Sequence, residues 1–229
     1  MKKIGLIGGM SFESTIPYYK IINEEINKTL GGLNSAEIIL YSVNFCEIEE
    51  CQKNNDWEKS AQILTQAGLK LQNAGADFIL ICTNTMHKIA PQIQSKLKIP
   101  IIHIAQSTSK ELIDNNIETT ALLGTKYTMQ EDFYKKILIE NGINVLIPEK
   151  DDIEIINKII FNELCCGIIK KSSKEKFLEI IKKLQENGAQ GVVLGCTEIG
   201  LLIEQKDVAI KVFDTTIIHS KHAAKLALE

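Results

Sequence analysis

Two apolar runs that each end in a Cys-Thr pair constrain this chain of 229 residues more than any other feature. The first run covers residues 78–82 and is followed by Thr83, and the second covers residues 191–196 and is followed by Thr197. Each follows a short Gly-Ala turn and gives way to polar residues, as buried strands of a parallel sheet do. Ligands bind beyond the carboxyl ends of such strands. We therefore expect the thiols of Cys82 and Cys196 to occupy equivalent positions in two similar units and to face one cleft.

The surrounding pattern also occurs twice. A strand pattern at residues 3–7 leads into Gly8-Gly9, and a second one at residues 119–123 leads into Gly124-Thr125 at nearly the same distance from its cysteine. Strand and helix patterns alternate in both halves, which indicates βαβ units. We predict an α/β fold of two similar αβ lobes, each a small parallel sheet flanked by helices. We expect a pseudo-two-fold relation with the active site between the lobes, which are residues 1–100 plus 212–229 and residues 101–211.

Composition excludes several classes of protein. The formal net charge of −3 gives no electrostatic basis for binding nucleic acid or an anionic membrane surface. Neither a membrane span nor a secretion signal is visible, because no apolar run approaches 18 residues, and we expect a cytoplasmic protein. Six cysteines without a CxxC motif indicate reduced thiols rather than disulfides. The four histidines lack zinc-finger spacing, and no GxGxxG fingerprint is present, so neither a metal nor a dinucleotide cofactor is expected.

Two opposed cysteines suit proton transfer at a carbon centre. A thiolate on one face can remove a proton while a thiol on the other face returns one, which inverts the centre without a cofactor. We expect a helix N-terminus capped by Thr83, Asn84 or Thr85 to lower the pKa of Cys82. Glu198 either caps the following helix or keeps Cys196 protonated, because a nearby carboxylate raises a thiol pKa.

Other interpretations stay open at this point. One cysteine could act alone in an isomerase or decarboxylase of a small carboxylic acid. The chain could bind an amino acid without catalysis, or both cysteines could be core residues. Because the chain contains no arginine, backbone N–H groups, Thr and Asn side chains, or a lysine would have to bind a carboxylate.

Several segments together resemble one family over essentially the whole chain. They are Gly5-Leu6-Ile7-Gly8-Gly9-Met10-Ser11, Cys82-Thr83-Asn84-Thr85-Met86-His87 and Gly195-Cys196-Thr197-Glu198-Ile199. These resemble the aspartate/glutamate racemase family, which consists of cofactor-independent amino-acid racemases with two similar αβ domains. Gly9-Met10-Ser11 and Glu198 differ from the Asp-Ser-Gly turn and the histidine of the related cell-wall glutamate racemases. The resemblance is therefore to the aspartate/glutamate and broad-specificity branch.

The resemblance implies roles for particular residues. Cys82 and Cys196 would be the two acid/base groups, and Thr83, Asn84 and Thr85 would hold the α-carboxylate. Met10, Thr125 and Thr197 would line the pocket, although simple packing would equally explain Met10. Aspartate-specific relatives have basic residues near the positions of Gln52 and Cys165, with Cys166 as the alternative to Cys165. The neutral Gln52 therefore favours a broader specificity.

The same resemblance implies a homodimer without pyridoxal phosphate or metal. Of the histidines, we expect His87 to cap a helix or lie on the surface, and His219 and His222 to be solvated.

Overall fold

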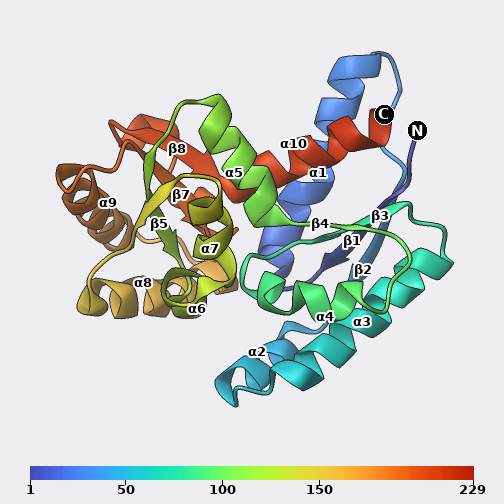
Figure 1. Cartoon of the computed structure of the whole chain (residues 1–229), viewed down its shortest axis with the longest axis horizontal. Helices are drawn as coiled ribbons and strands as arrows, with labels where there is room; N and C mark the ends of the chain where they lie inside the picture. The colour runs from blue at the N-terminus through green and yellow to red at the C-terminus, as the bar shows by residue number, and fades with distance from the viewer. The chain divides into compact units, whose positions relative to one another are not determined.

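Two four-stranded parallel sheets organise the computed structural model, which describes residues 1–229 (Figure 1). The first has the order β2-β1-β3-β4 and consists of β1 (Ile4–Gly8), β2 (Ile38–Ser42), β3 (Phe78–Ile81) and β4 (Ile101–Ile102). The second has the order β6-β5-β7-β8 and consists of β5 (Thr119–Gly124), β6 (Asn144–Leu146), β7 (Gly191–Gly195) and β8 (Lys211–Asp214). Both sheets have the same order of strands along the chain, which confirms the predicted α/β fold with two lobes.

The chain divides into two compact units that differ slightly from the expected lobes. Unit 1 comprises Met1–Ile104 and His219–Glu229, and unit 2 comprises Ala105–Ile218. We expected residues 212–218 in the first lobe. They lie in unit 2 because β8 forms its backbone hydrogen bonds with β7 of the second sheet. Only within the last helix, α10 (Thr215–Leu228), does the chain return to unit 1.

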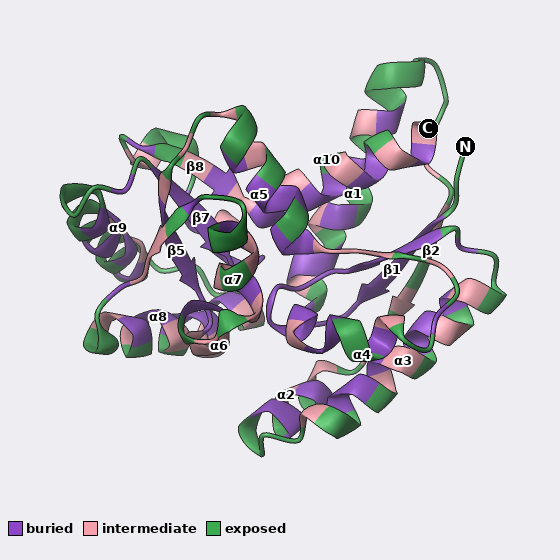
Figure 2. Ribbon diagram, in the orientation of Figure 1, coloured by how far each residue is buried: buried purple, intermediate pink, exposed green.

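In unit 1, helices cover both faces of the sheet, because consecutive strand side chains point to opposite faces. One face packs against α1 (Phe12–Leu30) and the unit 1 part of α10, through residues such as Leu6, Leu80 and Tyr18. The other face, which includes Ile7 and Ile79, packs against α2 (Phe45–Lys53), α3 (Trp57–Asn73) and α4 (Ala90–Gln94). Figure 2 shows the resulting pattern, with buried residues on the central strands and on the inner sides of the helices.

Unit 2 has its own apolar core. Side chains of β5 and β7, such as Leu123 and Leu194, pack against α8 (Lys150–Asn162) and α9 (Lys171–Glu186). The unit also contains α5 (Ile104–Asp114), α6 (Lys126–Gln130) and α7 (Asp132–Glu140). Tyr134 of α7 is fully buried, and its hydroxyl donates a hydrogen bond to Thr108 Oγ1 of α5 at 3.0 Å. Each unit therefore contains its own clusters of buried apolar side chains.

Two local elements differ from the expected helices. The sequence predicts a helix around residues 88–96, whereas the structure has a 3₁₀ helix, η1 (Thr85–Ile89), followed by α4. Pro91 lies in the first turn of α4, where its missing N–H group costs no hydrogen bond, so a new helix starts there. Further 3₁₀ helices are η2 (Leu164–Cys166), η3 (Ile199–Leu201) and η4 (Gln205–Asp207). Helix α2, which carries Gln52, was not predicted.

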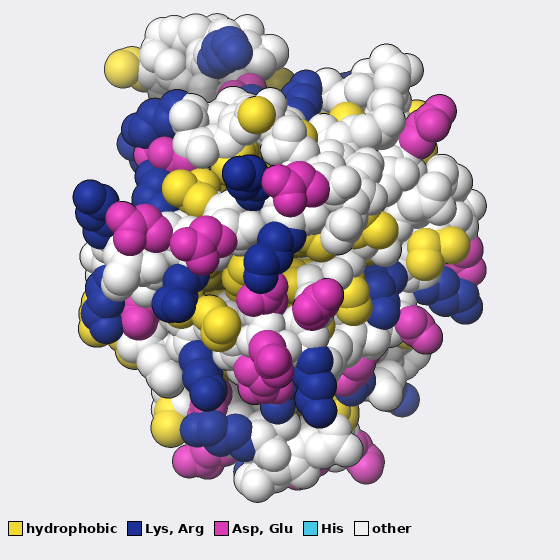
Figure 3. Space-filling view, turned by 90° about the vertical axis from the view of Figure 1, so that its left-hand side faces the viewer, with side chains coloured by type: hydrophobic (Ala, Val, Ile, Leu, Met, Phe, Trp, Pro, Cys, Tyr) yellow, Lys and Arg dark blue, Asp and Glu magenta, His cyan; other side chains and the backbone are white.

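Lysines and acidic residues are interspersed on the surface. On α9, Lys171 pairs with Glu175 and Lys182 pairs with Glu186, each one helical turn apart. Figure 3 shows the same mixture of positive and negative side chains across one face of the molecule. None of the helices combines the length and the apolar composition needed to cross a membrane.

Candidate functional site

Cys82 is the first residue after β3, and its surroundings are apolar. Its N–H group donates to the carbonyl of Ile7 in β1 at 2.9 Å, so the backbone here is held by the sheet. The side chain is fully buried in the cluster that includes Leu80 and Tyr18. Burial raises the pKa of the Cys82 thiol above its ordinary value. The expected lowering of this pKa is therefore wrong for the ligand-free protein.

Thr83, Asn84 and Thr85 are all buried beside Cys82. Asn84 occupies the position before η1, but its backbone is already helical and its side chain makes no capping hydrogen bond. The predicted capping role is therefore wrong for Asn84, because a capping side chain needs an extended backbone at this position. The structure does bring the three polar residues together within one turn of chain next to the thiol. Their binding of a carboxylate stays a prediction.

Gln52 reaches the Cys82 segment from α2. Its side chain is buried, and Nε2 donates to Sδ of Met86 at 3.1 Å. Its neighbour Lys53 has a side chain that is 70% exposed and forms an ion pair with Glu49 at 2.7 Å. The structure thus places a neutral amide, and not the ammonium group of Lys53, beside the Cys82 segment.

Met10 and Gly9 belong to the turn after β1. Met10 is buried in the apolar cluster of unit 1 that includes Ile7 and Ile48, so it packs there as a core residue. Gly9 has a φ of +91°, and its N–H group donates to Thr15 Oγ1 at 2.9 Å. A side chain at this glycine would meet the carbonyl of Val43, 2.3 Å from the new Cβ. The turn is therefore closely packed against the end of β2.

In unit 2, Cys196 lies beside a carboxylate. Its thiol donates to Glu198 Oε2 at 3.0 Å, and the Thr197 hydroxyl donates to the same oxygen at 2.9 Å. All three side chains are buried. Burial, followed by the charge of Glu198, raises the pKa of Cys196 well above its ordinary value. This is the direction predicted for Glu198. The alternative role as a helix cap is absent, since Glu198 makes no side-chain cap of η3.

Cys165 lies in η2 and is partly buried. Burial and then the charge of Glu198, which also accepts a hydrogen bond from this thiol, raise the pKa of Cys165. Cys166 is exposed, and its thiol points to the carbonyl of Phe161 at 3.7 Å. Of the two neighbouring cysteines, Cys165 is therefore the one that joins Cys196 around Glu198.

Thr125 follows β5, as predicted, and serves as the N-cap of α6. Its Oγ1 accepts a hydrogen bond from the Thr128 N–H group at 3.4 Å. The side chain is buried. This capping role is enough to explain a threonine directly after Gly124. That Thr125 lines a pocket therefore stays a prediction.

The two cysteines are not at strictly equivalent positions. In the first sheet Ile7 pairs with Ile81, so Cys82 is level with Gly8 at the end of β1. In the second sheet Gly124 pairs with Gly195, so Cys196 lies one residue beyond the corresponding level. The difference of one residue reverses the face of the sheet to which a side chain points. Accordingly, Cys82 packs in the layer of α1, whereas Cys196 packs in the layer of α8 and α9.

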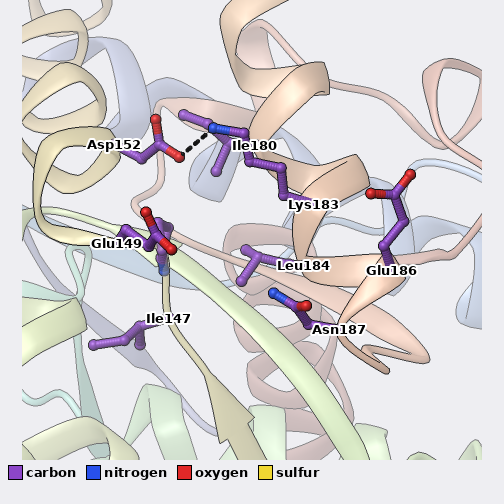
Figure 4. A pocket seen from close by; sticks show the side chains of 9 residues that line it. Ile147, Glu149, Asp152, Ile180, Lys183, Leu184, Glu186 and Asn187 are labelled. Atoms are coloured by element: carbon purple, nitrogen blue, oxygen red, sulfur yellow. Dashed lines mark hydrogen bonds and ion pairs between the residues drawn. The ribbon is translucent and has the colours of Figure 1, made fainter.

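A pocket elsewhere in the structure does not involve the two cysteine segments. One pocket of about 280 Å³ lies between α8 and α9, where Lys183 pairs with Asp152 at 2.9 Å (Figure 4). None of the residues that line it is a predicted site residue. No group of three or more His, Cys, Asp and Glu side chains is arranged so that it could hold a metal ion.

Comparison with known proteins shows which family the chain belongs to. The sequence model described as Asp/Glu/Hydantoin racemase matches residues 7–223. This chain belongs to that family. A solved structure from Yersinia pestis, provisionally described as an Asp/Glu racemase, is 49% identical and covers both chains completely, with a TM-score of 0.92. An aspartate racemase homologue from Pyrococcus horikoshii OT3 is 40% identical over the whole of both chains, with a TM-score of 0.85.

Among curated proteins, the chain is similar to the broad specificity amino-acid racemase RacX of Bacillus subtilis (strain 168). The identity is 25% over 222 residues, which are 95% of each chain. Membership of the Asp/Glu/hydantoin racemase family supports an isomerase. The two cysteine segments described above both lie within the region that the family model matches.

The structure of this family member also shows what the sequence patterns missed. His87 and His219 are buried, not at the surface or solvated as expected. Burial, with neighbouring histidines, lowers the pKa of His87, and burial lowers the pKa of His219 to about 3. The only sequence signal that placed His87 near the site was its position five residues after Cys82. Besides Thr83, its ring contacts His103 and Ile104, which no local pattern could indicate.

Proposed function

We propose that this chain is a cofactor-independent amino-acid racemase that moves the substrate's α-proton between Cys82 and Cys196. The observation that supports this most directly is the Cys-Thr pair at the carboxyl end of the third strand of each sheet, in a member of a racemase family. Ligands of parallel α/β sheets bind at this end of the strands. The mechanism requires that the two sulfur atoms lie on opposite faces of the α-carbon.

In the proposed reaction one proton leaves the α-carbon and one proton is added to it in each turnover. One cysteine, as thiolate, takes the α-proton, so the C–H bond breaks and an S–H bond forms. The electron pair left on carbon delocalises into the α-carboxylate, where donors of the Thr83–Thr85 turn stabilise the added charge. The other cysteine, as thiol, then gives its proton to the opposite face. The reverse reaction exchanges the two roles.

The surroundings of the two thiols differ in charge. Both have a raised pKa, so each is mainly a thiol in the ligand-free protein at neutral pH. A bound α-ammonium group would favour the thiolate of either one. Glu198 adds a negative charge beside Cys196, at 3.0 Å. We therefore propose that substrate meets a Cys82 thiolate and a Cys196 thiol more often than the opposite pair.

A broad specificity is the second part of this proposal. Gln52 provides a neutral amide at the Cys82 segment, Lys53 pairs with Glu49 at the surface, and the chain has no arginine. The relative from Bacillus subtilis is named as a broad specificity racemase. We propose amino acids with neutral polar side chains as substrates in addition to aspartate and glutamate. The homodimer implied by the resemblance stays a prediction, which light scattering of the purified protein tests.

Incubation of single enantiomers in deuterated water tests the proposal. A racemase inverts the centre and incorporates deuterium at the α-carbon, and Cys82→Ser or Cys196→Ser reduces inversion by at least about 10³-fold. Cys46→Ser is the matched control, because Cys46 is exposed on α2. Inversion that persists in either serine variant contradicts the two-cysteine mechanism. Release of carbon dioxide would indicate a decarboxylase instead, and binding without deuterium incorporation would indicate a binding protein.

A further inference from the structure

His87, five residues after Cys82, joins two segments of unit 1 through its ring. Nδ1 lies 2.8 Å from the carbonyl oxygen of Thr83, and Nε2 lies 3.2 Å from the backbone nitrogen of Ile104. The Ile104 N–H group can only donate and the Thr83 carbonyl can only accept. The neutral ring therefore carries its proton on Nδ1 and accepts on Nε2. One side chain thus fixes both the carbonyl next to Cys82 and the first residue of α5.

A second histidine makes a similar bridge beside the first. His219 Nε2 lies 2.8 Å from the carbonyl oxygen of Ile102, and its Nδ1 lies 2.9 Å from the hydroxyl of Tyr18. The ring of His87 is 5.9 Å from that of His219 and 4.5 Å from that of His103, measured between ring centroids. These histidines form a packed group, which we call the histidine group: His87, His103 and His219.

The histidine group lies at the two places where the chain leaves and re-enters unit 1. The outgoing chain crosses after Ile104, whose N–H group binds His87. The returning chain enters unit 1 at His219 itself. The Cys82 turn is thus connected, through side chains of unit 1 alone, to both crossing points. A histidine that only fills space in the core would not need both ring nitrogens hydrogen-bonded to the backbone. In His87 both are, one to Thr83 and one to Ile104.

We propose that His87 is a positioning residue for Cys82, which holds the Thr83 carbonyl, and with it the Cys82–Asn84 turn, against the start of α5. This inference rests on the proposed function of Cys82 as an acid/base group. Proton transfer between sulfur and carbon depends steeply on geometry, and a displacement of about 1 Å can cost about 10²-fold in rate.

Two substitutions separate the two hydrogen bonds of the ring. The side-chain amide of asparagine reaches the position of Nδ1, so His87→Asn retains a donor to the Thr83 carbonyl. The longer glutamine reaches the position of Nε2, so His87→Gln retains an acceptor for the Ile104 N–H group. We expect His87→Gln to lower kcat by about 10- to 100-fold with less than a threefold change in KM. We expect His87→Asn to recover at least about tenfold of that loss.

His222→Gln, a substitution of a histidine on the same helix as His219, serves as the control and should leave kcat unchanged. Circular dichroism and thermal melting identify the folded variants. The inference is overturned if folded His87→Gln has the kcat of the wild type, or if His87→Asn is no more active than His87→Gln. Cys82→Ser separates this inference from the proposed function. If Cys82→Ser still inverts substrate, the proposed function fails; if it is inactive while His87→Gln is fully active, only the positioning role fails.

Discussion

Glu198 shows how one buried carboxylate makes two otherwise similar thiols different. Burial is the cause of the raised pKa at Cys82, whereas the charge of Glu198 adds to burial at Cys196. The shared oxygen Oε2 also accepts the Thr197 hydroxyl, so the carboxylate is held in place by its neighbours. The pKa of Cys196 is thus raised by a charge within unit 2 in addition to burial.

The substitution Glu198→Gln tests this difference directly. Removal of the charge should lower the pKa of Cys196, and each unit of that decrease increases the thiolate fraction about tenfold below the pKa. The rate of alkylation of Cys196 by iodoacetamide at pH 8, followed by mass spectrometry of the peptide, should rise by about tenfold. Cys82 in the same sample is the internal control and should react as in the wild type. An unchanged Cys196 rate would contradict the electrostatic role of Glu198.

Gln52 provides a second test at the residue scale. Its amide lies beside Met86 and carries no charge, so a substrate with a distal carboxylate gains no ion pair there. Gln52→Arg should raise kcat/KM for aspartate relative to homoserine by about tenfold, because a guanidinium group binds a carboxylate bidentately. Lys53→Gln is the matched neighbour control, since Lys53 points to solvent. If both variants change the ratio equally, residue 52 does not set the specificity.

At the scale of elements, the strand ends and the turns that follow them place the site segments. The turn after β1 depends on Gly9, whose positive φ disfavours other residues and whose missing side chain leaves room for Val43. Gly124 at the end of β5 is in a similar situation, because an added Cβ would lie 2.7 Å from the carbonyl oxygen of Gly195. Gly9 thus allows the backbone of Val43 to approach the turn after β1. Gly124 in the same way allows the backbone at the end of β7 to approach β5.

A pair of glycine substitutions measures the cost of that close approach. Gly9 and Gly75 have nearly equal φ angles of +91° and +93°, but an added Cβ at Gly75 meets nothing within 4 Å. Gly75→Ala should cost about 1–2 kcal/mol of unfolding free energy from backbone strain alone. Gly9→Ala should cost about 1–3 kcal/mol more because of the steric clash. Urea unfolding followed by the fluorescence of Trp57, the only tryptophan, reports on unit 1. Equal costs would show that the turn relaxes freely.

At the scale of the whole molecule, two units with separate cores are built from one chain. Unit 1 contains the histidine group, and unit 2 contains the buried Glu198 with its thiols. The pKa values of the three histidines are lowered, so the stability of the protein depends on pH through them. For His103 burial lowers the pKa to about 4, and for His219 to about 3.

The histidine group should make unit 1 less stable in mild acid. A histidine pKa is about 6.5 in the unfolded chain, so the unfolded state binds more protons as pH falls below 6.5. Each such histidine then removes up to about 1.4 kcal/mol of unfolding free energy per pH unit, until the pH reaches its folded pKa. Urea unfolding followed by Trp57 between pH 7 and 5 measures this slope. His103→Gln should reduce the slope by about one proton, and an unchanged slope would show that the pKa of His103 is the same in the folded and unfolded states.

Much of the architecture could be predicted because buried parallel strands are marked by local residue patterns. The runs before Cys82 and Cys196 and the glycine turns identified β1, β3, β5 and β7, and their alternation with helices gave the α/β fold. The helix α2 is short, buries only Ile48, Cys51 and Gln52, and was missed. The boundary near residue 212 was placed too early because the pairing of β8 with β7 is a long-range property.

The sequence alone determined which residues end the central strands, because apolar periodicity and glycine turns act over a few neighbouring positions. It therefore determined that two Cys-Thr pairs lie at the carboxyl ends of two parallel sheets. Only the tertiary structure decided the level of Cys196 relative to the sheet, the contact between Gln52 and Met86 across 34 positions, and the burial of His87 against Ile104. The physical reason is that solvation, register and side-chain hydrogen bonding depend on segments far apart in the chain.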